Sequence, residues 1–374
     1  MSAPTRIALF LPGLHGGGAE RVMLRLAGAF ADRGLAVDLV LAQACGPYLS
    51  EVAPNVRLVD LRAGRVLASL PHLTRYLRAE RPTALLSTLE HANVVALGAV
   101  RLARVPVHLV VREANVFVPH EARGVRARAL PLLMRRVYPR AGRVVAVSRS
   151  VAESLVRGLG LPREQVVTIY NPVLTPDLAE RMGAPCPDPW LAPGEPPVIL
   201  GAGRLCAQKD FGTLLRAFAR VRAERAARLI IVGEGEERGA LEDLARRLGV
   251  ADDVRLPGFA PNVFAYMARA HAFALSSRYE GLPGVLIQAL ACGCAVVATD
   301  APGGSHEVLD GGRLGALVRP GDDLALAQVL LRALREPRPG PGARGAEWSR
   351  FSEETTVGQY LHELIGDHRA GSGA

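Results

Sequence analysis

The chain has 374 residues, room for two domains of ordinary size, with 49% hydrophobic and 22% charged residues. The formal net charge is +9, but only 5% of the residues are aromatic and no helix-turn-helix, RNP or zinc-finger pattern is found, which argues against nucleic-acid binding. The five cysteines form no CxxC pair, which predicts reduced thiols. We find no signal peptide and no apolar run of about eighteen residues, and therefore expect a cytoplasmic protein.

The first half of the chain alternates strand and helix patterns and carries the excess positive charge. Residues 1–171 hold 23 basic and 11 acidic side chains, whereas the remainder holds 22 basic and 25 acidic ones. We therefore expect the first half to meet an anionic surface. The predicted strands and helices are Arg6–Leu11, Ala36–Leu41, Ala84–Ser87, Val107–Val111 and Val144–Val147, with Ala19–Asp32, Pro71–Glu80 and Ala122–Val137.

The second half repeats this alternation, and such βα repeats predict a doubly wound parallel sheet in each half. Its predicted strands are Val198–Gly203, Leu229–Val232, Val254–Leu256, Ala272–Leu275 and Ala295–Thr299. Eight prolines between Asn171 and Pro197 predict a linker rather than a packed element. Two sheets on either side of a hinge predict a cleft, a favoured place for a ligand.

Two loops after predicted strands are suited to anions. Gly16–Gly18 precede a helix, where glycine permits close approach of a ligand and N–H groups are free. Lys209, the only lysine of the chain, shares a later loop with Arg204. An ammonium and a guanidinium at the carboxyl edge of a sheet would hold both phosphates of a diphosphate. The alternative is that both are solvated loop charges.

The turn Arg278–Pro283 connects a strand to the predicted helix Leu282–Ala291 and contains a carboxylate, Glu280. A turn that follows a parallel strand lies at the ligand-binding edge of the sheet. The alternative role for Glu280 is a charge that interacts with the helix dipole.

Glu280-Gly281-Leu282-Pro283 resembles the donor-binding signature of the family 4 retaining glycosyltransferases, and the resemblance extends over most of residues 5–320. It implies the α/β GT-B fold, two Rossmann-like domains facing across a cleft. It further implies an acceptor-side domain over 1–175, a donor domain over 176–345, and a C-terminal helix at about 348–366 that packs back on the first domain. The family has a second glutamate eight positions after the first, where this chain has Gln288.

The resemblance also implies a set of site residues, with no cofactor and no metal. Arg204 and Lys209 would stabilise the charge that develops on the departing diphosphate, and Glu280 would bind hydroxyls of the transferred sugar. The implied substrate-binding residues are Gly17, Gly18, Gly203, Gly281, Leu282, Pro283 and Gln288. Arg112 and Glu113 stand where many relatives have a sugar-contacting histidine, and either replace it or form an ion pair within their domain.

We therefore expect a metal-independent, retaining hexosyltransferase that uses a nucleoside-diphosphate sugar, by resemblance a UDP-sugar. The resemblance implies a lipid-linked or polysaccharide acceptor and no nucleic-acid partner. Segment 120–143 has seven arginines around an apolar run, which predicts peripheral contact with an anionic membrane at its inner face; the alternative is a helix with its leucines in the core. A GT-B enzyme with a soluble or protein acceptor, and a non-catalytic nucleotide-sugar binder, remain alternatives.

Overall fold

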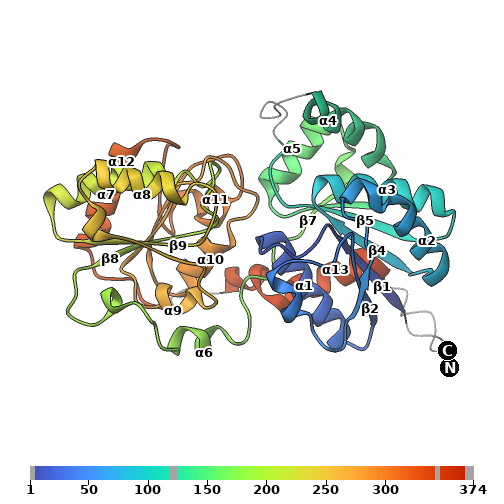
Figure 1. Cartoon of the computed structure of the whole chain (residues 1–374), viewed down its shortest axis with the longest axis horizontal. Coiled ribbons are helices and arrows are strands. Elements are labelled where there is room, and N and C mark those ends of the chain that lie inside the picture. The colour runs from blue at the N-terminus through green and yellow to red at the C-terminus, as the bar shows by residue number, and fades with distance from the viewer. Residues whose placement is uncertain (1–4, 118–124, 342–345, 367–374) are drawn as a thin grey trace. The chain divides into compact units, whose positions relative to one another are not determined.

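The structure is a computed structural model that describes residues 5–117, 125–341 and 346–366. Its contacts divide the chain into two compact units (Figure 1). The first unit comprises the chain up to Pro172 together with the chain from Arg350 onward, and the second comprises Val173–Ser349. None of the described helices is long and apolar enough to cross a membrane.

The first unit is built on a sheet of seven parallel strands in the order β3-β2-β1-β4-β5-β6-β7. The strands are β1 Arg6–Leu11, β2 Ala36–Leu41, β3 Arg57–Asp60, β4 Ala84–Thr88, β5 His108–Glu113, β6 Arg143–Ala146 and β7 Val166–Thr168. The helices are α1 Gly18–Asp32, α2 Leu70–Glu80, α3 Glu90–Ala103, α4 Val125–Val137, α5 Arg149–Leu159 and α13 Glu353–Ile365. The strand order reverses between β1 and β4, where ligands of such sheets bind.

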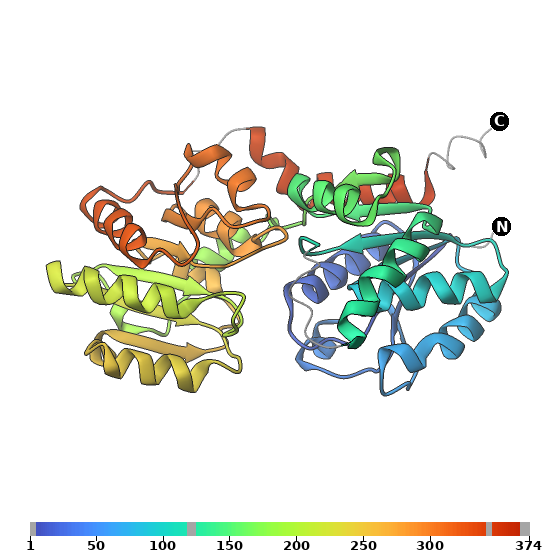
Figure 2. The same cartoon turned by 90° about the horizontal axis from the view of Figure 1, so that it is seen from above.

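The last helix, α13, packs with α1 against one face of this sheet (Figure 2). Phe30 of α1 and Tyr360 of α13 are both fully buried in that core. Polar bonds hold α13 in place as well, because Arg143 on β6 pairs with Glu363 at 3.0 Å. Helix α13 is therefore part of the first unit, although the whole of the second unit precedes it in the sequence.

The second unit has six parallel strands in the order β10-β9-β8-β11-β12-β13. The strands are β8 Val198–Ala202, β9 Arg228–Val232, β10 Val254–Gly258, β11 Ala272–Leu275, β12 Ala295–Thr299 and β13 Ala316–Val318. The helices are α6 Leu178–Gly183, α7 Phe211–Glu224, α8 Arg238–Arg247, α9 Val263–Met267, α10 Gly284–Ala291, α11 Ser305–Val308 and α12 Asp323–Arg335. Here the order reverses between β8 and β11.

The core of the second unit lies where α7, α8 and α12 cover one face of the sheet, while α9 and α10 lie on the other (Figure 1). Phe211 and Phe218 of α7 are buried there. After α12 the chain returns through Arg338, whose guanidinium donates to the carbonyls of Met267 at 2.9 Å and Gly293 at 3.1 Å. This side chain satisfies carbonyl groups at the ends of α9 and α10 that have no partner within the helices.

The two doubly wound parallel sheets confirm the predicted fold class. Three short strands, β3, β7 and β13, were not predicted, and β5 continues two residues beyond its predicted end. Arg112 and Glu113 therefore lie within β5 instead of in the turn after it. The proline-rich stretch was expected to lack packed elements, but it contains α6, which packs with α9. That expectation was wrong because the six residues of α6 contain no proline.

Candidate functional site

Lys209 and Glu280 meet at the point where the strand order of the second unit reverses. Lys209 lies in the loop after β8, and Glu280 lies in the loop after β11. These two strands are neighbours in the sheet, so both loops emerge side by side at its carboxyl edge. In doubly wound sheets this crevice is the usual place for a ligand.

The two side chains form a close ion pair. Lys209 Nζ lies 2.6 Å from Glu280 Oε1, and their side chains are 16% and 7% exposed. Lys209 is therefore not a solvated loop charge. Glu280 lies four residues before the first residue of α10, so its carboxylate is outside the first turn of that helix. The pair places one positive and one negative group, both shielded from water, next to each other at the edge of the sheet.

Further bonds fix the two loops against each other. The hydroxyl of Ser276 donates to the carbonyl of Lys209 at 2.8 Å, and the side-chain amide of Gln208 donates to the carbonyl of Tyr279 at 3.0 Å. Arg278 pairs with Asp210 at 3.2 Å, and Asp210 also caps the start of α7. Backbone and side-chain bonds thus set the separation of Lys209 and Glu280, so it does not depend on their ion pair alone.

The loop after β12 supports Glu280 from the other side. The backbone N–H of Glu280 donates to the carbonyl of Pro302 at 2.9 Å, and Gly304 donates to the carbonyl of Gly281 at 2.8 Å. Gly303 has a φ of +130°, and a Cβ at this position would lie 2.1 Å from the carbonyl oxygen of Glu280. Only glycine allows this approach.

The other residues predicted for this half lie around the pair. Arg204 is exposed in the loop of Lys209, and a Cβ at Gly203 would lie 3.1 Å from Cε of Lys209. Gly281, Leu282 and Pro283 are buried between Glu280 and α10. Gln288 is half-buried in the second turn of α10. Their roles in binding stay predictions.

In the first unit, the glycine turn lies after β1, beside the reversal between β1 and β4. The N–H of Gly17 is already bonded to the carboxylate of Glu20, a buried residue of α1. Gly18 is exposed, and a Cβ there would meet no atom within 4 Å. Of the two, Gly18 is the more accessible to a ligand.

Arg112 is 1% exposed, and within the described part of the chain its side chain is bonded to neutral groups of its own unit. Its guanidinium donates to Thr88 Oγ1 at 2.9 Å, to Asn171 Oδ1 at 2.6 Å and to the hydroxyl of Tyr360 at 3.1 Å. Thr88 belongs to β4, Asn171 belongs to the segment at the boundary of the first unit, and Tyr360 belongs to α13. Arg112 thus ties three distant parts of the chain together, and a direct contact with substrate stays a prediction.

Glu113 is 3% exposed and accepts bonds from the hydroxyl of Tyr138 and from Asn93 Nδ2, the latter at 2.9 Å. Burial and the nearby charge of Glu90 raise the pKa of Glu113 to about 7, although both hydrogen bonds oppose this shift. The side chains of Arg112 and Glu113 therefore take different hydrogen-bond partners. Leu89 between β4 and α3 has a φ of +75°, a strained backbone of the kind that gathers at functional edges.

Helix α4 presents an apolar and basic surface. Leu132 and Leu133 are 65% and 43% exposed, and Arg135 and Arg136 are exposed beside them, whereas Met134 is buried. The expectation that the leucines of this helix face the core is therefore wrong for these two. Residues 120–124 of the predicted membrane-contact segment lie outside the described residues.

Sequence reasoning missed Ser277, Asn93 and Tyr138, which bond candidate residues, and Thr299, which bonds Ser277. Ser277 Oγ donates to Glu280 Oε1 at 2.6 Å, and Thr299 Oγ1 donates to the carbonyl of Ser277 at 2.5 Å. For Ser277 and Thr299 the sequence offered one signal, a polar residue at the carboxyl end of an apolar strand.

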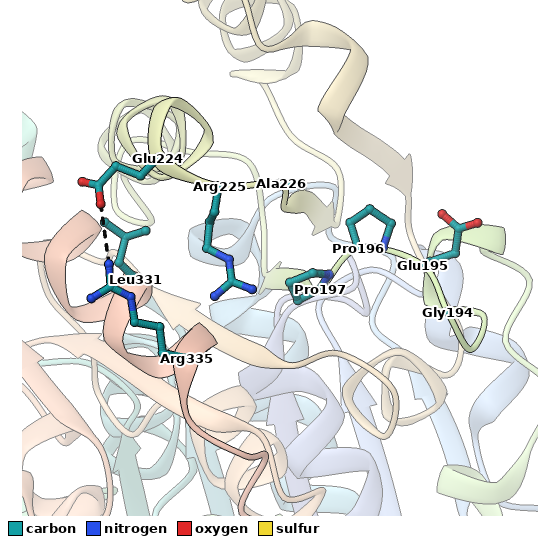
Figure 3. A pocket seen from close by; sticks show the side chains of 9 residues that line it. All are labelled: Gly194, Glu195, Pro196, Pro197, Glu224, Arg225, Ala226, Leu331 and Arg335. Carbon is teal, nitrogen blue, oxygen red and sulfur yellow. Dashed lines mark ion pairs between the residues drawn. The ribbon is translucent and has the colours of Figure 1, made fainter.

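A cavity of about 540 Å³ opens elsewhere on the second unit (Figure 3). It is lined by Gly194, Glu195, Pro196, Pro197, Glu224, Arg225, Ala226, Leu331 and Arg335. Pro197 and Ala226 come just before β8 and β9, so the cavity lies at the amino-terminal edge of the sheet. Lys209 and Glu280 lie at the opposite edge.

Family models match both halves of the chain. The model described as Glycosyltransferase Family 4 matches residues 16–175, and the model described as Glycosyl transferases group 1 matches residues 196–336.

Individual proteins are similar to this chain over most of their length. An N-acetylgalactosamine-N,N'-diacetylbacillosaminyl-diphospho-undecaprenol 4-alpha-N-acetylgalactosaminyltransferase from Campylobacter jejuni is 28% identical over 89% of this chain and 91% of its own. The lipopolysaccharide core biosynthesis glycosyltransferase LpsE from Rhizobium meliloti is 27% identical over 94% of each chain. The solved structure of Anabaena HepE in complex with UDP-glucose has a TM-score of 0.78 at 22% identity, covering 96% of this chain and 99% of that one.

Proposed function

Since the chain belongs to the family 4 glycosyltransferases, we propose that it transfers a hexose or hexosamine from a UDP-sugar to a lipid-linked or polysaccharide acceptor, with retention and without a metal ion. The observation that carries the proposal is the pairing of Lys209 with Glu280 at the reversal of the second sheet. One residue of this pair suits a diphosphate and the other suits sugar hydroxyls.

Lys209 and the exposed Arg204 bind the diphosphate in this proposal. An ammonium has three donors, so Lys209 retains its bond to Glu280 while it donates to a phosphate oxygen. As the bond between the anomeric carbon and the phosphate oxygen breaks, negative charge grows on the diphosphate, and the two cations stabilise it. The acceptor hydroxyl attacks the same face of the sugar, and its proton passes to the departing phosphate.

Glu280 orients the hexose. Its Oε1 accepts from both Lys209 and Ser277, and none of the residues that the structure describes bonds its other oxygen, Oε2. Oε2 therefore remains to accept a hydrogen bond from a sugar hydroxyl. A charged acceptor makes such a bond stronger than a neutral one would.

The choice of donor and acceptor rests on the relatives. Anabaena HepE binds UDP-glucose, which supports a UDP-sugar. The name of the Campylobacter jejuni relative specifies a diphospho-undecaprenol glycan, which supports a lipid-linked acceptor. The exposed leucines and arginines of α4 fit an anionic membrane surface.

The donor proposal is tested by calorimetric titration with UDP and with UDP-, GDP- and ADP-sugars, with and without EDTA. Replacing Arg204 and Lys209 together by alanine should weaken UDP binding by about 100-fold or more, because two charge-assisted contacts are lost. The matched control is Arg220→Ala with Arg246→Ala, two exposed cations on α7 and α8. If replacing Arg204 and Lys209 leaves the UDP affinity unchanged, these two cations do not bind the diphosphate. If UDP binding is lost in EDTA, the proposed metal independence is refuted.

The membrane contact is tested by sedimentation with vesicles of phosphatidylcholine alone or with phosphatidylglycerol. Changing Arg135 and Arg136 to serine should reduce binding to the anionic vesicles by about 30-fold, at about 1 kcal/mol for each arginine. Equal binding of the variant and the unaltered protein excludes α4 as the membrane-contact surface.

A further inference from the structure

The carboxylate of Glu280 is held by two donors on a single oxygen. Lys209 Nζ and Ser277 Oγ each lie 2.6 Å from Oε1. Ser277 is fully buried, three residues before Glu280 in the same loop. The proposed function uses Lys209 and Glu280 but gives no task to Ser277.

The sheet itself fixes the position of Ser277. Thr299, the buried last residue of β12, donates its hydroxyl to the carbonyl of Ser277 at 2.5 Å and is also 3.4 Å from the carbonyl of Leu275, where β11 ends. The neighbouring strand thus holds the backbone of Ser277 two residues after its own strand has ended. The serine hydroxyl is a fixed donor, whereas Lys209 reaches Glu280 through a long, flexible side chain.

We infer that Ser277 is a positioning residue for Glu280 in sugar transfer. The inference rests on the proposed function, in which Lys209 also binds the diphosphate. When the ammonium of Lys209 moves toward phosphate oxygens, the Ser277 hydroxyl keeps Oε1 in place, so that Oε2 stays directed at the hexose. Without this hydroxyl, the carboxylate follows Lys209 and loses its orientation toward the sugar.

The central experiment compares UDP with UDP-glucose and UDP-N-acetylglucosamine in the Ser277→Ala variant. The UDP dissociation constant should change by less than about threefold, because Ser277 does not contact the diphosphate cations. The kcat/KM for acceptor-free hydrolysis of the UDP-sugar should fall by about 10- to 100-fold, the range for one hydrogen bond to a charged group. A purely structural role would instead weaken the binding of UDP and UDP-sugar together.

Two comparisons establish that Ser277 acts through Glu280. In a Glu280→Ala background, adding Ser277→Ala should cause no further loss, because the group it positions is absent. Ser277→Thr keeps the hydroxyl and should restore part of the lost hydrolysis. The control is Thr356→Val on α13, which removes a fully buried hydroxyl that has no hydrogen-bond partner among the described residues. It tests whether the loss of a buried hydroxyl by itself lowers hydrolysis, and no such loss is expected.

The outcomes separate the two proposals. If the unaltered chain hydrolyses a UDP-sugar and Ser277→Ala does so equally well, the positioning role is wrong and the proposed function stands. The positioning role is also overturned if Ser277→Ala lowers the kcat/KM for hydrolysis by the same factor in the unaltered chain and in the Glu280→Ala variant. If the unaltered chain binds neither UDP nor a UDP-sugar, the proposed function fails and the role of Ser277 fails with it.

Discussion

Replacing Glu113 by glutamine should make the stability of the first unit less sensitive to pH. Burial, together with the charge of Glu90, raises the pKa of Glu113 from 4.5 to about 7, against the hydrogen bonds from Tyr138 and Asn93 and the positive charge of Arg112. The native state therefore keeps the proton up to about pH 7, whereas the unfolded chain releases it near pH 4.5. Because the native state binds more protons between these values, its free energy of unfolding falls as the pH rises.

The size of this effect follows from the two pKa values. Between pH 5 and pH 8 the native protein loses about 2.5 kcal/mol of unfolding free energy through Glu113, since each pKa unit corresponds to about 1.4 kcal/mol. Glutamine has no proton to release and still accepts bonds from Tyr138 and Asn93 through its amide oxygen. The variant should therefore gain about 2.5 kcal/mol relative to the unaltered protein over this pH range.

Urea unfolding at pH 5, 6, 7 and 8, followed by circular dichroism, measures the difference between the two proteins at each pH. Comparing them at the same pH cancels the contributions of titrating groups that do not interact with Glu113. Glu336→Gln, at an exposed position after α12, serves as the control and should show no such trend. A difference between Glu113→Gln and the unaltered protein that stays constant from pH 5 to 8 would refute the reasoning.

Three further substitutions test the second unit. Gln288→Glu should retain UDP binding or improve it about fivefold in calorimetry, because a charged acceptor exceeds a neutral one by about 1 kcal/mol; a large loss would show that the side chain is used differently. Arg338→Ala should lower the free energy of unfolding by about 2 kcal/mol in urea, since carbonyl groups ending α9 and α10 lose their donor; an unchanged urea midpoint would contradict this. Gly303→Ala should reduce UDP-sugar hydrolysis more than tenfold, because the added Cβ displaces Glu280. The control is Gly312→Ala, which also strains a positive φ but places its Cβ within 4 Å of no atom, and which should leave hydrolysis unchanged. Equal hydrolysis by the two variants would contradict the expectation for Gly303.

The resemblance to family 4 glycosyltransferases and the βα repeats predicted the fold, but not the short strands β3, β7 and β13. Strands such as β1 are buried on both faces, so their sequences are nearly continuous apolar runs that can be recognised. The edge strand β3 is largely exposed, and its sequence has no such run. The pattern of a short edge strand does not differ from that of a loop, and only its pairing with β2 shows that it belongs to the sheet.

Arg204, Lys209 and Glu280 were found from the sequence because each lies in a loop after an apolar strand, whereas Gln288 was named through the resemblance. Their arrangement was not found, because Lys209 and Glu280 are 71 positions apart and meet only through the pairing of β8 with β11. For Arg112, the sequence suggested contact with sugar or acceptor, or an ion pair within its domain. The structure shows that Arg112 is buried and bonded to Tyr360, 248 positions away, a partner that no pattern in the sequence indicated; its contact with substrate stays a prediction.

The sequence by itself determined most of the strands and helices, with β3, β7, β13 and α6 as the exceptions, since hydrophobic periodicity and glycine turns are local properties. It also determined which charged residues stand at the ends of strands. Only the tertiary structure decided which of these charges pair, which are buried and which remain exposed. Burial and hydrogen bonding depend on groups brought together from distant parts of the chain, and such contacts leave no local pattern in the sequence.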